Sequence, residues 1–414
     1  MKLLVHDYAG HPSQVHLSRQ LAVRGHDVTH AYFAEDPGPK GVLHSQKDDP
    51  LSLHFVAISI GRPYDKSSLV TRHVNDVEYG RRATEFIKDL SPDVVISGNT
   101  PSEAQAAIMR ASKAVQAGFV YWMQDFYSIA AGTLLRKRLG IVGAIIGWYY
   151  RFLERRQLRE SDAVVVITDD FRPLASAWAR SNDKVHTIEN WASFDDLSLF
   201  MKENDWSREH GLDDRFVFLY TGTLGRRNNP GFLVRLAQEC DSGACVVVVG
   251  QGVGMKQLEA AKAEHRLESL RLLPLQPATR FPEVLATGDV LVGLLETDAG
   301  TFSVPSKVQS YLCAGRPILL AAPSGNLAAR NVASEDAGIV VGPQDQAGFA
   351  AAAAQLRDNP ELRERLGANG RAYAVRTFDI IKITDSFEKV LRIAVGKSDS
   401  GRTPNTDHLS DAGR

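Results

Sequence analysis

The chain has 414 residues, more than one hydrophobic core usually serves, so its length predicts two domains. Apolar residues make up 44% and charged residues 23% of the chain, which is the ordinary composition of a soluble globular protein. The formal net charge of -1 provides no overall field that would attract a polyanion, so nucleic acid is excluded as an expected partner.

Short apolar runs that end in Gly, Asp, Asn or Pro alternate with helical patterns along the chain. The predicted strands are Lys2–Tyr8, Asp27–Phe33, Leu53–Ile58, Val94–Ser97, Phe119–Met123, Ala163–Thr168 and Val185–Glu189, then Phe216–Tyr220, Ala244–Val249, Leu270–Leu273, Val290–Leu295, Pro317–Ala321 and Gly338–Val341. Runs such as Val246–Val249 are apolar on both faces, as in parallel strands that helices cover on each side. The predicted fold class is therefore α/β, with two doubly wound, Rossmann-like sheets.

The first series of strands ends near Asn190, and the polar segment Asp195–Asp214 is the best candidate for a linker. We expect an amino-terminal domain over residues 1–196 and a carboxyl-terminal domain over 197–376. Residues 396–414 are rich in Ser, Asp, Gly and Thr, which predicts a disordered tail. The first residues lack the apolar core of a signal peptide and read as a strand. The three cysteines lack metal-ligand spacing, so we expect reduced thiols in a cytoplasmic protein and no metal site.

The first strand-to-helix turn brings polar side chains to the carboxyl end of a strand, where open α/β sheets bind ligands. Gly10 permits a tight turn and Ser13 can cap the helix that follows. His11 and Gln14 are placed to bind sugar hydroxyls there. The alternative is a plain helix start that binds nothing.

A second candidate follows the apolar strand Phe119–Met123, which delivers Asp125 beyond its carboxyl end. A carboxylate at this place could orient an acceptor hydroxyl or accept its proton, whereas the alternative role is to cap a loop. Asn99, at the end of the preceding strand, is a weaker candidate.

The segment 134–159 combines an uncharged run, Leu139–Tyr150, with flanking cations. These cations are Arg136, Lys137, Arg138, Arg151, Arg155, Arg156 and Arg159. The run is too short to span a bilayer, which takes about 20 residues. Apolar residues with Trp and Tyr between cations indicate a surface that dips into an anionic membrane. The alternative is a helix buried in the first domain.

The second domain opens with Phe216–Tyr220 followed by Gly222, Thr223, Gly225 and Arg226. The glycines allow backbone N–H groups to approach a ligand, and a phosphate is the natural partner for these groups and a guanidinium. Further along, Gly250-Gln251-Gly252 resembles a dinucleotide motif, but Met255 stands where the last glycine belongs. We interpret that segment as a strand-to-helix turn at the ligand edge.

The stretch from Glu296 to Pro317 ends a strand, runs through a loop and starts a helix after Pro305. Ser306 and Lys307 lie in the first turn of that helix. A helix amino terminus that carries a lysine is a suitable diphosphate site. Gly315 ends the helix.

With these segments the chain resembles the family 4 glycosyltransferases, retaining enzymes of the GT-B fold, and most closely the branch that builds exopolysaccharides and O-antigens. The residues that carry the resemblance are Val304–Lys307, Tyr311-Leu312, Ala314–Pro317, Tyr220–Arg226, Trp122–Asp125, Ser161–Ile167 and Ile188–Trp191. They follow the family's order over roughly residues 1 to 390.

The resemblance implies a nucleotide-diphosphate sugar on the second domain and a glycan or lipid-linked acceptor on the first. Arg226 and Lys307 would neutralise the diphosphate, so neither a metal nor another cofactor is expected, and Asp125 would lie beside the reacting carbon. The predicted donor contacts are Gly222, Thr223, Gly225, Arg226, Gln251, Pro274, Glu296, Ser306, Lys307 and Ser310, and the predicted acceptor contacts are His11, Gln14, Asn99 and Trp122. The helix at residues 377–395 would cross back to the first domain.

The chain departs from the family at two glutamates that many members carry eight positions apart. Their places hold Phe302 and Ser310 here, so Ser310 and the off-register Glu296 would have to make the ribose and sugar contacts.

The predicted function is therefore sugar transfer in bacterial polysaccharide synthesis, at the cytoplasmic face of the membrane. Two alternatives remain open. A sugar-nucleotide 2-epimerase has the same fold but gives segment 134–159 no purpose, and a two-lobed binding protein would show no turnover.

Overall fold

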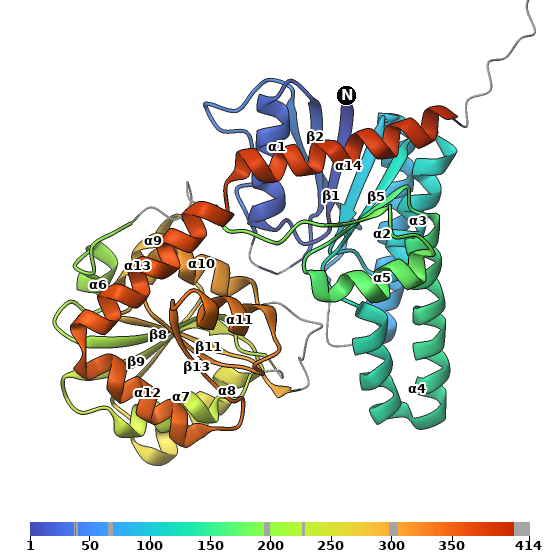
Figure 1. The fold of residues 1–414 in the computed structure, drawn as a ribbon. Coiled ribbons are helices and arrows are strands. Elements are labelled where there is room, and N and C mark those ends of the chain that lie inside the picture. Colours follow the sequence, from blue (N-terminus) through green and yellow to red (C-terminus); the bar gives the residue numbers. More distant parts are fainter. Residues whose placement is uncertain are drawn as a thin grey trace, which may run out of the picture. The chain divides into compact units, whose positions relative to one another are not determined.

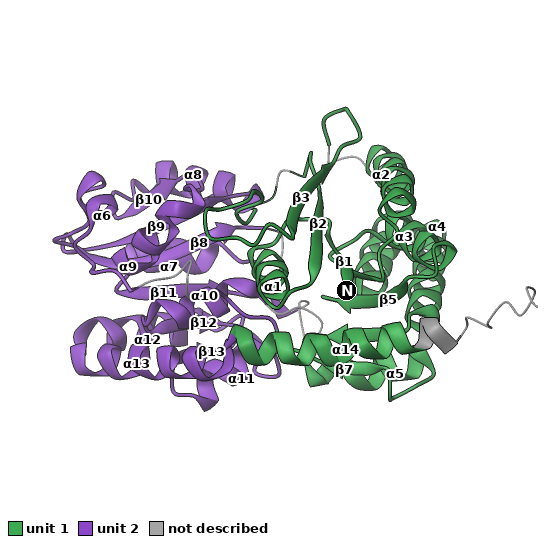
Figure 2. Ribbon diagram, turned by 90° about the horizontal axis from the view of Figure 1, so that it is seen from above, with its two compact units in different colours: residues 1–189, 380–414 green, residues 190–379 purple. Residues whose placement is uncertain are grey.

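The computed structural model describes residues 1–36, 38, 40–64, 69–193, 199–225, 228–297 and 305–400. The chain forms two compact units, of which unit 1 comprises residues 1–189 and 380–414 and unit 2 comprises residues 190–379 (Figure 2). Each unit is built around one parallel sheet, which confirms the predicted α/β fold class. Residues 401–414 of the predicted tail lie outside the described residues.

Unit 1 contains a seven-stranded sheet in the order β3-β2-β1-β4-β5-β6-β7. Every neighbouring pair in it is parallel. The strands are β1 (Lys2–Asp7), β2 (Asp27–Phe33), β3 (Leu53–Ile58), β4 (Val94–Gly98), β5 (Gly118–Met123), β6 (Ala163–Val166) and β7 (Val185–Thr187). All five residues of β4 and all six of β5 are buried, as expected for central strands that are covered on both faces.

Figure 1 labels the α-helices of unit 1. The helices are α1 (Pro12–Val23), α2 (Leu69–Leu90), α3 (Ser102–Ala114), α4 (Tyr127–Glu160), the 3₁₀ helix η1 (Asp169–Phe171), α5 (Arg172–Ala179) and the carboxyl-terminal α14 (Ile380–Ser400). Because each of α1, α3 and α4 follows a parallel strand, the first turns of these helices lie at the carboxyl edge of the sheet.

Helix α14 packs on the sheet of unit 1 although it follows unit 2 in the sequence. Phe387 of α14 meets Trp122 of β5 with 4.7 Å between ring centroids. A Cβ on Gly118 would lie 2.8 Å from the carbonyl oxygen of Ala394, so this glycine permits the close approach of helix and strand. Arg24 of α1 binds Asp385 at 2.5 Å and secures the same helix. The helix extends beyond residue 395, into the segment predicted as tail.

Unit 2 contains a six-stranded parallel sheet in the order β10-β9-β8-β11-β12-β13. Its strands are β8 (Phe216–Thr223), β9 (Ala244–Gln251), β10 (Leu270–Leu273), β11 (Val290–Leu294), β12 (Ile318–Ala321) and β13 (Gly338–Val341). Its helices are α6 (Asp205–Glu209), α7 (Gly231–Glu239), α8 (Val253–His265), η2 (Ala278–Arg280), α9 (Phe281–Thr287), α10 (Ser306–Ala314), α11 (Leu327–Ser334), α12 (Gln346–Asp358) and α13 (Pro360–Thr377). Phe232 of α7 and Phe349 of α12 meet with 5.0 Å between ring centroids in its core.

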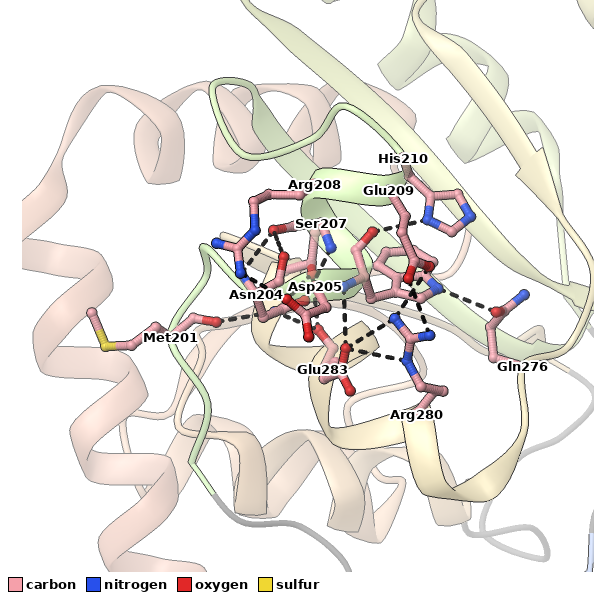
Figure 3. Close-up of polar contacts among 12 residues, drawn as sticks. Met201, Asn204, Asp205, Ser207, Arg208, Glu209, His210, Gln276, Arg280 and Glu283 are labelled. Atoms are coloured by element: carbon pink, nitrogen blue, oxygen red, sulfur yellow. Dashed lines mark hydrogen bonds and ion pairs between the residues drawn. The ribbon is translucent and has the colours of Figure 1, made fainter.

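The prediction of a linker over Asp195–Asp214 is wrong for the part that holds α6. Asn204 and Ser207 form a capping box at the start of this helix, and Trp206 is fully buried. Arg280 joins the cluster by binding Glu209 at 3.2 Å and Glu283 at 3.1 Å (Figure 3). The polar composition of the segment therefore reflects hydrogen bonding that docks α6 on unit 2.

Candidate functional site

The carboxyl edge of the unit 2 sheet has a topological switch between β8 and β11. The chain proceeds outward from β8 through β9 and β10, and outward from β11 through β12 and β13. Open parallel sheets bind ligands where the strand order reverses in this way. The end of β8 and the start of α10, which follows β11, therefore form the candidate phosphate site.

Lys307 of α10 is the central residue of this site. Its Nζ is buried and has no hydrogen-bond partner among the described residues. It lies 3.7 Å from the centroid of the Tyr220 ring, a favourable cation–π distance. Burial lowers the pKa of Lys307 from 10.5 to about 7, since no anion compensates the lost hydration. An anionic ligand is the group that would satisfy this ammonium.

The backbone around Lys307 leaves room for such a ligand. Gly222 adopts a φ of 99°, and a Cβ added there would lie 3.8 Å from Lys307 Nζ. This left-handed conformation favours glycine, so the residue lets the end of β8 turn beside the ammonium without a side chain. No side chain of the described residues caps the amino terminus of α10, where the N–H groups of Ser306 and Lys307 precede Val308 N, which donates to the Pro305 carbonyl at 3.2 Å.

Tyr311 fixes the orientation of α10 relative to the two strands. Its hydroxyl accepts a hydrogen bond from Thr221 N at 3.0 Å and donates to the Val292 carbonyl at 3.3 Å. The ring is fully buried. Tyr311 therefore holds Lys307, one turn earlier on the helix, against β8. The sequence pattern gave no signal for this pairing, whose partners are 90 positions apart.

The structure brings several predicted donor residues to the same edge. Gly225 N donates to Asn228 Oδ1 at 2.9 Å, and Asn228 Nδ2 donates to the Leu294 carbonyl at 2.7 Å, so the loop after β8 is tied to β11. Thr223 is exposed at the end of β8. Ser306 is exposed at the start of α10, and Ser310 follows four residues later on the same face.

The remaining predicted donor residues lie at or after the ends of other strands of the unit 2 sheet, or outside the described residues. Gln251 pairs with Thr223 in the β8–β9 register and is exposed. Glu296 is half-buried directly after β11. Pro274 follows β10, two strands from β8 and so about 10 Å away along the sheet. Arg226 lies outside the described residues, as does Phe302.

In unit 1, the first strand-to-helix turn is organised by Asp7. This carboxyl is fully buried and accepts hydrogen bonds from the backbone of His11 and, at 3.2 Å each, from Ala9 N and Asn99 Nδ2. Burial raises the pKa of Asp7 to about 7. Asn99 therefore holds the turn with its amide nitrogen. Burial also lowers the pKa of His11 to about 4, so its half-buried ring is neutral at pH 7.

Two predicted acceptor contacts, Trp122 and Gln14, are buried. Trp122 has no exposed surface and packs on Phe387 beneath α14. Gln14 is 1% exposed, and its amide lies against the backbone of Gly98, where a Cβ would be 2.9 Å from Gln14 Nε2. Both side chains pack within unit 1, and Gln14 Oε1 is buried without a hydrogen-bond partner among the described residues.

Asp125 is exposed in the turn between β5 and α4. A second carboxylate, which sequence reasoning missed, lies in its neighbourhood. Glu154 is buried and accepts hydrogen bonds from Ser128 Oγ at 2.5 Å and Ser128 N at 3.4 Å. Burial raises the pKa of Glu154 to about 7, and the charge of Asp125 adds to the increase. Two carboxylates with different environments are a recurrent feature of acid–base sites.

Helix α4 is a hairpin of two helical arms, visible in Figure 1. Gly140 breaks it with a φ of 56° and a ψ of -126°. The arms touch at glycines, since a Cβ on Gly147 would lie 2.8 Å from Gly132 Cα. Large apolar side chains of the hairpin are exposed, and these are Leu134, Leu139, Ile141, Val142, Ile145, Trp148, Tyr149 and Phe152. The alternative that this segment is buried in the domain is therefore wrong.

No group of three or more His, Cys, Asp or Glu side chains among the described residues could hold a metal ion. Likewise, no helix in the described part of the chain is long and apolar enough to cross a membrane.

Two family models match the chain. The one described as "Glycosyl transferase 4-like domain" matches residues 11–191, and the one described as "Glycosyl transferases group 1" matches residues 202–373. A curated relative, the alpha-D-kanosaminyltransferase of Streptomyces kanamyceticus, is 23% identical over 256 residues. That match covers 58% of this chain and 63% of the relative, less than two thirds of its length.

Solved structures share the fold along nearly the whole chain. Anabaena Alr3699/HepE in complex with UDP-glucose gives a TM-score of 0.70 at 15% identity and covers 95% of this chain and 99% of that one. Sucrose-phosphate synthase from Thermosynechococcus elongatus gives 0.73 at 14% identity, with the same coverage. WaaG, a glycosyltransferase involved in lipopolysaccharide biosynthesis, gives 0.67 at 17% identity and covers 95% of this chain and 100% of that one.

Proposed function

The chain belongs to the glycosyltransferases of the GT-B fold, and we propose that it is a retaining enzyme that moves a sugar from a nucleotide-diphosphate sugar to a lipid-linked glycan acceptor. The observation that carries the donor assignment is the buried, unpartnered Nζ of Lys307 beside Gly222 at the β8–β11 switch. Retention rests on the resemblance of the segments Val304–Lys307 and Ala314–Pro317 to family 4 enzymes.

In the proposed reaction the bond between the sugar C1 and the diphosphate oxygen breaks, and the electron pair stays on that oxygen. The Lys307 ammonium and the free N–H groups of α10 neutralise the negative charge that develops there, and Arg226 would add a second cation. The acceptor oxygen forms the new bond to C1 on the same face. Its proton passes to a diphosphate oxygen or to Asp125, which orients the acceptor. The proposal includes no metal or other cofactor.

A peripheral position on the cytoplasmic face of a cell membrane belongs to the same proposal. The exposed apolar side chains of the α4 hairpin lie between exposed cations, Arg136, Lys137 and Arg138 on one arm and Arg151, Arg155 and Arg156 on the other. Apolar contact with acyl chains and ionic contact with anionic headgroups would act together. A lipid-linked acceptor of bacterial cell-surface polysaccharide synthesis would meet the enzyme at this surface.

The experiment is a thermal-shift screen of UDP, GDP, ADP and dTDP, followed by turnover of the matching nucleotide sugars. The nucleotide that binds should stabilise the protein by about 2.7 kcal/mol when its concentration is a hundred times its dissociation constant. Transfer to a lipid-linked acceptor with the anomeric configuration of the donor, read by NMR, supports the proposal. Inversion of that configuration, an epimer formed without acceptor, or binding without any turnover each contradict it.

A further inference from the structure

A group of polar and aromatic side chains, separate from the proposed donor site, converges at the carboxyl edge of the unit 1 sheet. They come from the first two turns of α2, the first turns of α3 and α4, and the returning arm of the α4 hairpin. We call them the root cluster, and its members are Arg72 and Asp76 of α2, Glu103 of α3, and Tyr127 and Tyr150 of α4. Tyr127, the first residue of α4, lies two residues after Asp125, the carboxylate that we propose to orient the acceptor.

Contacts within the described residues tie the cluster together. Arg72 Nε lies 3.7 Å from Asp76 Oδ2, and the Arg72 guanidinium lies 6.0 Å from the centroid of the Tyr127 ring. The rings of Tyr127 and Tyr150 meet edge to face with 5.8 Å between centroids. Asp76 also accepts hydrogen bonds from Tyr8 at 2.8 Å and Tyr64 at 3.1 Å, which fixes its carboxylate.

The pKa of Tyr127 is affected by the charges of several members of the cluster. Burial raises the pKa of Tyr127, the positive charge of Arg72 opposes the rise, and the negative charges of Glu103, Asp76 and Asp125 add to it. Charges from α2, α3 and the β5–α4 turn therefore act on Tyr127, and the Arg72 guanidinium is 6.0 Å from the centroid of its ring. Tyr127, Tyr150, Arg72 and Glu103 are half-buried, so part of the cluster is open to solvent, whereas Asp76 is 4% exposed.

The cluster has an unsatisfied donor. Arg72 Nε is buried without a hydrogen-bond partner in the described part of the chain, because the 3.7 Å to Asp76 exceeds a hydrogen bond. A buried donor without a partner is uncommon and asks for an explanation. A ligand oxygen placed between Arg72 and Asp76 would accept from the guanidinium and donate to the carboxylate.

A hydroxyl group can both accept a hydrogen bond from Arg72 and donate one to Asp76. A fully ionised phosphate offers acceptors only, and among the described members of the cluster it would meet the carboxylates of Asp76 and Glu103 as well as the cation Arg72. Half-buried tyrosine rings beside a few fixed polar groups are the usual lining for a small ring-shaped ligand. The chemistry therefore favours a neutral polyhydroxyl ring.

We propose that the root cluster binds the sugar ring of the acceptor, with a ring hydroxyl bridging Arg72 and Asp76 and the ring against Tyr127 and Tyr150. This assignment rests on the proposed transferase function and names the part of the acceptor that unit 1 recognises. It places the acceptor sugar at the root of the hairpin whose apolar end contacts the membrane, so a lipid-linked acceptor is held at both ends by the same element.

The test uses the whole chain with the nucleoside diphosphate that gives the largest thermal shift, and saturation-transfer NMR on methyl glycosides of glucose, galactose, mannose, N-acetylglucosamine and N-acetylgalactosamine. The variants are Arg72→Met, which keeps the length of the side chain, and Tyr127→Ala. The matched control is Arg81→Met on the same helix, where Arg81 is exposed and pairs with Glu78 and Glu85. The thermal shift induced by that nucleoside diphosphate, which reports on unit 2, is measured for every variant.

We expect at least one glycoside to bind the wild type and Arg81→Met. We expect its affinity to fall by about tenfold or more in Arg72→Met and in Tyr127→Ala, as for the loss of one charged hydrogen bond. Equal binding to wild type and Arg72→Met overturns the proposal. So does the absence of any glycoside binding, or Arg72-dependent binding of citronellyl phosphate, which carries the anion without a sugar. Failure of the transferase proposal would look different, because no nucleotide would then shift the melting temperature and no donor would turn over.

Discussion

The Lys307 ammonium lies 3.7 Å from the centre of the Tyr220 ring and makes no hydrogen bond to any described residue. The aromatic face compensates part of the lost hydration, but the pKa of Lys307 still falls to about 7 through burial. Tyr311 holds the helix that carries this lysine. The free protein therefore maintains a destabilised cation at the place where a diphosphate would bind, and stability is given up for binding.

Replacing Lys307 with Met should make the free protein more stable at pH 7, by roughly 1–2 kcal/mol. The folded pKa of about 7 lies below the ordinary value of 10.5, so the unfavourable burial of charge is fully present below pH 7. It disappears as pH rises from 7 to 10.5, since the folded chain releases its proton first. Thermal unfolding without nucleotide at pH 6 to 10 measures this. A variant that is less stable than the wild type at pH 7 contradicts it.

Donor binding should take up a proton above pH 7. The diphosphate favours the charged ammonium and raises the pKa of Lys307 from its free value of about 7, so the dissociation constant rises by up to about tenfold per pH unit above that value. Calorimetry in buffers with different ionisation enthalpies counts the protons. Lys307→Arg stays charged throughout, and its binding should not change with pH. Proton release, or equal pH dependence in both proteins, would rule out this role.

Glu154 should influence the reaction through Asp125. Burial raises its pKa to about 7, so the carboxyl ionises as pH rises through that value and its negative charge then acts on Asp125. Glu154→Gln retains an acceptor for Ser128 and should remove this step from the profile of kcat against pH at saturating donor. Glu154→Leu leaves Ser128 unsatisfied and should destabilise the fold by about 1–3 kcal/mol. The control is Glu160→Gln, at the end of the same helix. Superimposable wild-type and Glu154→Gln profiles exclude a positioning role.

The α4 hairpin should bind anionic membranes through its exposed end. Ile141 is 82%, Ile145 63% and Trp148 69% exposed, and burying each side chain in lipid contributes roughly 1.5–3 kcal/mol. Replacing Ile145 and Trp148 with Ser should abolish sedimentation with vesicles of phosphatidylglycerol, and high salt should weaken wild-type binding. Leu51→Ser is the matched control, since Leu51 is 98% exposed elsewhere on unit 1. Unchanged sedimentation of the double variant, with self-association lost instead, would show that the patch is covered by a second copy.

The sheets could be predicted from the sequence because central parallel strands are uniformly apolar. The run Ala244–Gln251 forms β9 and is buried along all but its last residue, as its valines predict. The hairpin in α4 could not be predicted in the same way. Its break depends on the positive φ of Gly140, and glycine within a helical pattern gives no sign of whether the chain turns there.

The candidate site was only partly predictable for a similar reason. The position of Lys307 follows from a local pattern, Pro305 before a helix, which the sequence displays directly. The pairs Thr221–Tyr311 and Ser128–Glu154 depend on tertiary packing, which no local pattern encodes. The burial of Trp122 could not be predicted either, because it depends on α14, which comes from the far end of the chain and packs Phe387 against it.

The central claim, that the buried ammonium of Lys307 is the counter-charge of the donor diphosphate, is tested most directly by titrating the preferred nucleoside diphosphate into three proteins. These are the wild type, Lys307→Met and the control Arg235→Met, whose exposed guanidinium pairs with Glu239 on α7. We predict that Lys307→Met binds about 30- to 1000-fold more weakly, corresponding to roughly 2–4 kcal/mol, while Arg235→Met binds like the wild type. Affinity of Lys307→Met within threefold of the wild type would contradict the account.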